Sequence, residues 1–163
     1  MLLTPVSGAT AEQRFAERRP GPLLAALLNP PSVSTGVRTL GAVRRAAEVL
    51  GFCGYEVVNL FAEPTPTVVE LNGTTGHERA WPAIQERLGE LLPVAGGVLG
   101  AWGVAGASGG LRRLLERRAR WLMEEAERNG HKEVWMVGGQ PRHPSRWHQY
   151  VADGHGRTSG GTF

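Results

Sequence analysis

The sequence predicts a three-layer α/β domain in which helices cover both faces of a four-stranded, mainly parallel sheet. Two observations predict this class. Four short apolar runs alternate with longer segments in which apolar residues recur at the spacing of one helical face. Glycine (23 residues) and proline (11 residues) fall between these segments rather than in one block, so they mark turns. Strands that alternate with helices form parallel sheets with right-handed crossovers and helices on both faces.

The first strand is expected over residues 23–28, an uninterrupted run of leucine and alanine. Its short length, and the prolines and glycine just before it, favour a buried central strand over a helix. Residues 1–21 are polar, and we expect them to be irregular apart from a short helix that begins near Thr10 and ends near Arg19. The first long helix is expected over residues 39–50, where apolar side chains share one face.

The remaining elements continue the alternation of strand and helix. Each strand is a compact apolar run, and each helix has apolar residues three and four positions apart. In chain order they are expected over residues 55–58 (strand), 77–92 (helix), 97–101 (strand), 111–128 (helix), 133–137 (strand) and 147–151 (a brief helix).

Composition indicates one globular domain. The chain has 163 residues, and we expect the domain to cover residues 1–150 and a Gly/Ser/Thr-rich tail, residues 151–163, to be disordered. The net charge is +3, and arginine supplies nearly all of the positive charge. Arginine binds phosphate and carboxylate groups, so an anionic partner is allowed. The single cysteine, Cys53, excludes an intramolecular disulfide. No long apolar stretch and no signal peptide is found, so we expect a cytoplasmic protein without membrane contact.

Neither a metal ion nor a cofactor is expected. The spacing of His143, His148 and His155 matches no common metal site. The glycine-rich loop over residues 106–110 lacks both a Walker lysine and a dinucleotide fingerprint. Several arginines lie on the predicted helix that follows this loop, and the glutamates among them indicate a solvated face; these arginines are Arg112, Arg113, Arg117, Arg118 and Arg120.

Polar or aromatic side chains follow each of the four predicted strands. Asn29 follows the first strand, Asn59 ends the second, and Trp102 follows the third. Residues 139–145 follow the fourth strand and contain His143. In parallel sheets, ligands bind beyond the carboxyl ends of the strands. We therefore expect these side chains to lie together at one edge of the sheet.

The loop after the fourth strand is built to hold its side chains in place. Gly138 and Gly139 allow a sharp turn or a close approach to a ligand. Two prolines then bracket Arg142 and His143 and restrict their backbone. His143 is therefore expected to have a fixed position at the end of a strand, although a proline-rich surface loop would have the same composition.

The residue types at this edge suit a planar heterocyclic ligand. An asparagine amide can pair with the edge of a nucleobase or hold a water, and a histidine can stabilise charge on a leaving group. An aromatic ring can stack on a planar ligand. The alternatives are that Asn29 and Asn59 cap the turns that follow them, and that Trp102 is an ordinary core residue.

Four segments resemble the family of uncharacterised bacterial proteins called DUF1643. The resemblance covers roughly residues 14–150 and implies a fold rather than an activity, because the family's biochemical role is not established. The segments occur in the family's order; they are residues 28–32 (Leu-Asn-Pro-Pro-Ser), 57–62 (Val-Val-Asn-Leu-Phe-Ala), 101–103 (Ala-Trp-Gly) and 139–144 (Gly-Gln-Pro-Arg-His-Pro).

A more distant resemblance is to the uracil-DNA glycosylase superfamily. Its members carry, after successive strands, a water-activating acid or asparagine, a base-reading asparagine, a Trp-Gly pair and a His-Pro-Ser motif. Asn29, Asn59, Trp102-Gly103 and the motif that begins at His143 match these places one by one. The resemblance implies the superfamily's fold, a four-stranded sheet between two layers of helices.

The same resemblance implies roles for individual residues. The catalytic pair would be Asn29, which would position the hydrolytic water, and His143, which would stabilise the departing base anion. The candidate substrate-binding residues are Asn59, which would read the base edge, Phe61 and Trp102, which would stack on the base or form a pocket wall, and Gln140, Arg142 and Ser145.

The chain also departs from these families at three places. Pro31 stands where a glycine would allow a closer approach, and the His-Pro-Ser motif continues as Arg146-Trp147 rather than with a proline and a wedge residue. Residues 37–39 (Val-Arg-Thr) replace an acidic Asp-Pro-Thr element. The fold is therefore expected with or without the activity.

The leading functional hypothesis is an N-glycosidic hydrolase that acts on a nucleobase-containing small molecule or nucleic acid. The first alternative is a module that binds a nucleotide or nucleic acid at the same edge without chemistry. The second alternative is a regulatory or interaction protein in which this edge is purely structural. The base, the choice among DNA, RNA and free nucleoside, and the oligomeric state are left open by the sequence.

Overall fold

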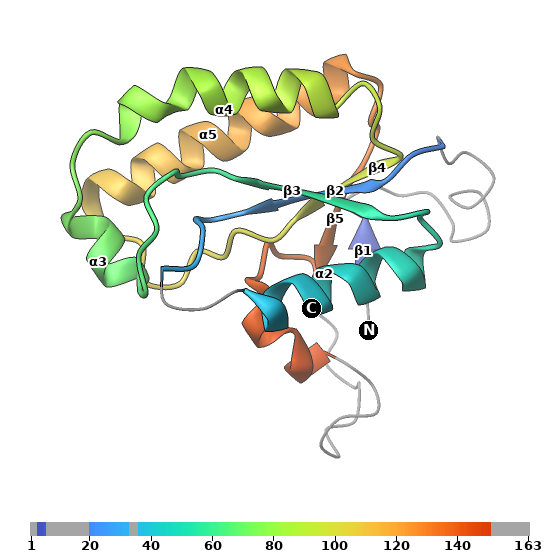
Figure 1. The fold of residues 1–163 in the computed structure, drawn as a ribbon, viewed down its shortest axis with the longest axis horizontal. Helices are drawn as coiled ribbons and strands as arrows, with labels where there is room; N and C mark the ends of the chain where they lie inside the picture. The colour runs from blue at the N-terminus through green and yellow to red at the C-terminus, as the bar shows by residue number, and fades with distance from the viewer. Residues whose placement is uncertain (1–2, 6–19, 33–35, 151–163) are drawn as a thin grey trace.

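The structure is a computed structural model, which describes residues 3–5, 20–32 and 36–150 (Figure 1). It confirms the predicted α/β class, with a parallel sheet between two layers of helices. The helix expected between Thr10 and Arg19 and the tail over residues 151–163 lie outside the described residues.

The four predicted strands are all present and form a parallel sheet in the order β5-β4-β2-β3. All five residues of the central strand β2 are buried, because helices cover both of its faces. A strand in this position can be uniformly apolar, which explains the run of leucine and alanine. The strands are β2 (Leu23–Leu27), β3 (Tyr55–Asn59), β4 (Gly97–Gly100) and β5 (Val134–Val137).

The helices lie in two layers, one on each side of the sheet (Figure 1). On one side are α3 (Val68–Gly73), α4 (His77–Leu91) and α5 (Gly109–Arg128), which share a hydrophobic core with one face of the strands. On the other side are α2 (Val37–Leu50) and the 3₁₀ helix η1 (Pro144–Tyr150), which share a second core with the opposite face. No helix in the described part of the chain is long and apolar enough to cross a lipid bilayer.

The sheet has one strand that was not predicted. Residues 1–21 were expected to be irregular, but β1 (Leu3–Pro5) pairs antiparallel with β5. This addition corrects the expectation for residues 3–5. An uncovered β5 would present unpaired backbone groups at the edge of the sheet, and β1 satisfies them. The described residues therefore form a five-stranded sheet with one antiparallel edge strand.

A second unpredicted element is α3, which begins directly after the loop that follows β3. It has only six residues, too few for an apolar repeat to be recognised. Its start is defined by Thr67, whose side-chain oxygen accepts a hydrogen bond from the backbone N–H of Glu70 at 3.2 Å. A threonine followed three residues later by a glutamate is the capping-box pattern, so this signal was present in the sequence.

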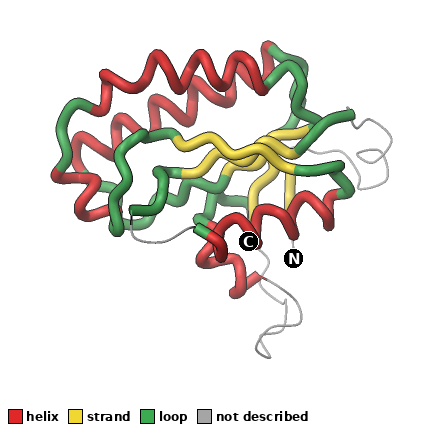
Figure 2. The backbone as a smooth tube through the Cα atoms, in the orientation of Figure 1, coloured by secondary structure: helices red, strands yellow, loops and turns green. Residues whose placement is uncertain are grey.

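The register of the sheet brings the strand ends to the same level. Leu27 lies opposite Asn59, Ala26 lies opposite Gly100, and Gly100 lies opposite Met136. All four parallel strands therefore end close together, and the loops that follow them gather at one end of the sheet (Figure 2).

Candidate functional site

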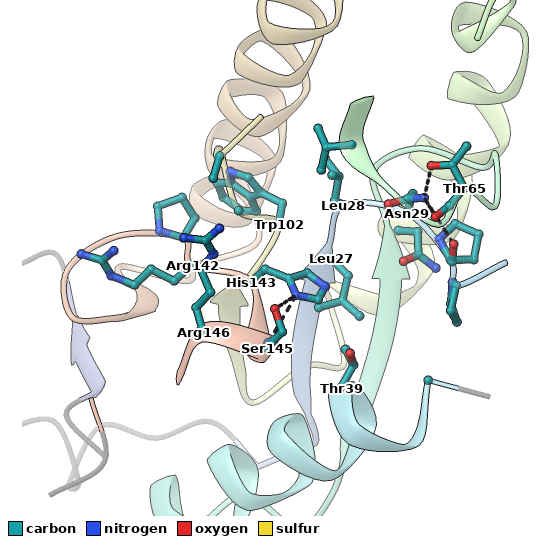
Figure 3. Close-up of a pocket in the computed structure, with 18 of the residues that line it drawn as sticks. Leu27, Leu28, Asn29, Thr39, Thr65, Trp102, Arg142, His143, Ser145 and Arg146 are labelled. Atoms are coloured by element: carbon teal, nitrogen blue, oxygen red, sulfur yellow. Dashed lines mark hydrogen bonds between the residues drawn. The ribbon is translucent and has the colours of Figure 1, made fainter. Parts of the chain in front are cut away.

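A cleft of about 530 Å³ opens at the carboxyl ends of the parallel strands. Figure 3 shows that the His143 side chain lies between Trp102 on one side and Asn29 and Thr65 on the other. Most of the predicted site residues line this cleft; they are Asn29, Asn59, Trp102, Gln140, Arg142, His143 and Ser145. The structure thus brings together residues that are widely separated in the sequence.

Asn29 has a fixed orientation because its amide nitrogen holds the loop after β3. The nitrogen donates to the carbonyl oxygens of Glu63 (3.1 Å) and Thr65 (3.3 Å) and to the Thr65 hydroxyl (3.0 Å). Carbonyl oxygens only accept hydrogen bonds, so the atom that faces them must be the nitrogen. The amide oxygen is therefore directed away from this loop, and it is available to accept a hydrogen bond in the cleft.

The loop that Asn29 holds is also tied to the helical layer. The Glu63 carboxylate lies 3.1 Å from Nδ1 of His77, the first residue of α4. The other ring nitrogen of His77 lies 3.0 Å from the Thr74 hydroxyl. Because that hydroxyl donates its proton to the Leu71 carbonyl oxygen, it must accept from Nε2 of His77. These contacts fix the wall of the cleft opposite His143.

Asn59 carries a buried hydrogen-bond acceptor without a partner. Its side-chain oxygen is inaccessible to solvent and makes no hydrogen bond with any described residue. A buried unpaired polar atom costs about 1–3 kcal/mol, so such atoms are rare unless something else binds them. Because Asn59 lines the cleft, its oxygen can accept a hydrogen bond from the N–H group of a ligand.

His143 is held in one neutral tautomer. Its Nδ1 accepts from the backbone N–H of Ser145 at 3.3 Å, and the Ser145 hydroxyl lies 2.9 Å from the same nitrogen. The ring proton must then be on Nε2, which is left as a donor. Burial is the main cause that lowers the pKa of His143, and the nearby positive charge of Arg146 lowers it further. His143 is therefore an uncharged hydrogen-bond donor at neutral pH.

Two glycines allow Trp102 and His143 to occupy their positions. A side chain at Gly100 would place its Cβ 3.0 Å from the Trp102 ring, and a side chain at Gly103 would place its Cβ 3.1 Å from Cβ of His143. Gly103 has a φ of 66°, in the left-handed region, and its N–H donates to the Pro141 carbonyl oxygen. The segment after β4 thus packs directly against the His143 loop.

Gly103→Ala is expected to destabilise the fold by about 1–3 kcal/mol, because the left-handed backbone is strained for alanine and the new Cβ presses on His143. Chemical denaturation of the purified variant measures this change. Gly110→Ala is the matched control, because Gly110 lies in α5 with open space around its Cβ position. We expect the control to be neutral or slightly stabilising; equal effects of the two changes would contradict the close packing described.

Phe61 does not belong to the site, contrary to the expectation that it stacks on the ligand. Its side chain is fully buried, and it packs edge-on against the ring of His77. Continued strand alternation would have placed Phe61 on the same side as Asn59. The strand ends at Asn59, however, and Phe61 turns into the core between the sheet and α5. Of the two predicted aromatic residues, Trp102 lines the cleft; it is 4% exposed, so it is also a core residue.

Arg118 was expected on a solvated face, and this expectation is wrong. The side chain is 1% exposed, and its guanidinium donates to the carbonyl oxygens of Leu60 (2.5 Å) and His77 (2.6 Å). It also lies over the rings of Phe61 (4.3 Å) and Trp81 (4.7 Å). Burial lowers the pKa of Arg118, and the glutamates Glu78 and Glu63 oppose this effect. Arg118 joins α5 to the segment that follows Asn59.

The sequence interpretation also missed several residues of the cleft. Thr39, at the start of α2, and Thr65, in the loop held by Asn29, both line it. Arg146 lines it as well, and its charge acts on His143. A single threonine, whether at the start of a helix or on a loop, carries no sequence pattern of its own, so only the three-dimensional arrangement identifies these two residues. Among the described residues, no group of three or more His, Cys, Asp or Glu side chains could hold a metal ion.

Comparisons with protein-family models, curated proteins and solved structures give no match to this chain. The functional inference therefore rests on the geometry of the cleft. The cleft offers a hydrogen-bond acceptor at Asn59 and a neutral donor at His143. The amide oxygen of Asn29, which is directed away from the loop after β3, is a second acceptor. This set can bind a planar ligand that has both N–H and carbonyl groups, and it can stabilise negative charge that develops next to Nε2 of His143.

Proposed function

We propose that the protein binds a nucleobase in this cleft and hydrolyses the N-glycosidic bond that joins the base to its sugar. The observation that carries the proposal is the buried oxygen of Asn59, which has no hydrogen-bond partner among the described residues and belongs to a residue that lines the cleft. A base with an N–H group beside a carbonyl, such as uracil or hypoxanthine, is complementary to the asparagine amide. The resemblance to the uracil-DNA glycosylase superfamily supports the same function.

In the proposed reaction, water adds to the anomeric carbon of the sugar as the carbon–nitrogen bond to the base breaks. The amide oxygen of Asn29 accepts a hydrogen bond from this water and orients it. The departing base takes the bonding electrons, and Nε2–H of His143 stabilises the negative charge by donating a hydrogen bond. The proton lost by the water ends on the released base, so the products are the free base and the sugar hemiacetal.

Binding without chemistry is a second candidate, and one observation favours it. The described residues that line the cleft include no aspartate or glutamate. A carboxylate is one of the groups that can remove a proton from an attacking water. Without it, Asn29 can orient the water but cannot take its proton. The purely structural alternative has less support, because packed side chains do not fill the cleft.

The experiment is an assay of base release, followed by chromatography, on nucleosides, nucleotides and oligonucleotides that contain uracil, hypoxanthine or xanthine. We expect the protein to release one of these bases and Asn59→Ala to lose most of the activity. Asn129→Ala is the matched control, because Asn129 lies at the distant end of α5. Saturable binding without release would support the second candidate. The absence of both binding and release would exclude both candidates.

A further inference from the structure

One side of the cleft is lined by two positively charged side chains. Arg142 and Arg146 lie on the same side as Trp102 and His143, away from Asn29 (Figure 3). The described residues that line the cleft include no lysine and no carboxylate, so these two arginines carry its only permanent charges. Arginine binds phosphate through several donors in a planar arrangement, and such hydrogen bonds are stronger than those between neutral groups.

The size of the cleft fits a small molecule. Its volume of about 530 Å³ lies within the range of roughly 300–1,000 Å³ that is typical of small-molecule sites. The Asn59 oxygen is buried, whereas Arg146 is exposed to solvent. A ligand that reaches from Asn59 to Arg146 would therefore have its base inside the cleft and its anionic group near the surface.

Half of the arginines on α5 form ion pairs with glutamates, which reduces the positive charge that this helix offers to a nucleic acid. Three of the six arginines of α5 pair with glutamates; the pairs are Arg112 with Glu116, Arg117 with Glu78, and Arg128 with Glu125. Proteins that bind a polynucleotide tightly contact many successive phosphates, and two arginines can neutralise only one or two.

The residue that follows Arg146 is also unsuited to opening a duplex. Proteins that unstack bases insert an exposed apolar side chain between them. Trp147 is the large apolar residue at this place, but it is 2% exposed and packs in the core beside α2. Its indole N–H donates to the Arg142 carbonyl oxygen at 2.7 Å. Trp147 therefore fixes the backbone of the loop that carries Arg142. It does not project into solvent, where it could contact a nucleic acid.

We propose that the ligand is a free nucleoside monophosphate, whose phosphate binds Arg146, with Arg142 beside it, while its base lies between Asn59 and His143. This inference rests on the proposed function for the position of the base. It adds the phosphate as a required part of the ligand, and it excludes duplex nucleic acid as the principal ligand.

Isothermal titration calorimetry with uridine, inosine and their 5′-monophosphates tests this inference. We expect the matching monophosphate to bind at least about tenfold more tightly than its nucleoside, as one charge-assisted contact allows. Arg146→Gln is expected to bring this ratio close to one. Arg120→Gln removes the same charge from an exposed position on α5 and is expected to leave the ratio unchanged.

The outcomes separate the two proposals. Equal affinity for nucleoside and monophosphate, together with base release, would overturn the present inference and leave the proposed function in place. Tighter binding of an oligonucleotide duplex than of any monophosphate, with a steep dependence on salt, would overturn it in favour of a nucleic-acid ligand. No binding of any of these compounds would overturn both proposals.

Discussion

Replacing Arg118 with alanine is expected to destabilise the protein by about 3 kcal/mol or more. The change removes both donors that satisfy the carbonyl oxygens of Leu60 and His77, and it leaves a cavity beneath Phe61 and Trp81. The buried Leu60 carbonyl that loses its donor and the lost packing both contribute to this cost. The measurement is the free energy of unfolding from urea denaturation followed by circular dichroism.

Arg117→Ala is the matched control for this prediction. Arg117 is the preceding residue of α5, but it is exposed and pairs with Glu78 at the surface. Such pairs contribute at most about 1 kcal/mol, so the control is expected to unfold close to the wild type. If Arg118→Ala does not fold, Arg118→Lys keeps the charge but cannot reach both carbonyls in the same way, and it should be intermediate. Similar stabilities for all the variants would show that Arg118 does not join the layers.

Replacing His143 with alanine is expected to slow base release by about 100- to 1,000-fold, the usual effect of removing one donor from a charge-stabilising site. The prediction depends on the proposed function. Nε2 of His143 is the neutral donor next to the departing base, and its tautomer is set by the hydrogen bond from the Ser145 N–H. Single-turnover kinetics measure the chemical step directly. His143→Gln supplies another neutral donor and is expected to recover part of the rate.

His148→Ala is the control for His143→Ala, because His148 is an exposed histidine of η1 that does not line the cleft. It is expected to retain the wild-type rate. A similar loss in both variants would indicate general damage to η1, and an unchanged rate in His143→Ala would remove His143 from the mechanism.

The lowered pKa of His143 determines how the protein responds to pH. An unperturbed histidine is half protonated near pH 6.5, but His143 stays neutral to a lower pH because it is buried and lies near Arg146. Protonation at Nδ1 would break the hydrogen bond from the Ser145 N–H that orients the ring, so the rate is expected to be constant down to about pH 6.5 and to fall only below it. Because the unfolded chain binds this proton more readily than the folded one, stability is greatest above about pH 6.5 and decreases as the pH falls toward the folded pKa. In His143→Ala this component of the pH dependence should be absent.

The sheet and its long helices could be predicted because their signals are local. An apolar run predicts β2, and helical repeats predict α2, α4 and α5. Each of these patterns lies within the segment that forms the element. Parallel strands end at one edge, so the meeting of Asn29, Asn59 and His143 followed from the order of the elements.

The remaining features depend on contacts between distant segments. The burial of Arg118 requires two carbonyl groups and two aromatic rings from other elements to meet it, and a charged residue on a helix carries no sign of such partners. Phe61 was misplaced because the direction of the chain changes after β3. β1 has three residues, too few for any periodic pattern. It forms because it pairs with the edge of β5, and the local sequence gives no sign of that distant partner.

The pairing of β1 with β5 joins residues 3–5 to residues 135–137, with nearly all of the domain between them. Contacts over such long separations close slowly, and during synthesis on the ribosome β5 emerges last of the five strands. A nascent chain that has reached β4 already contains both asparagines of the cleft but has no histidine opposite them. We therefore expect the nascent chain to gain the proposed activity only after the segment from β5 to η1 has been synthesised and can join the sheet.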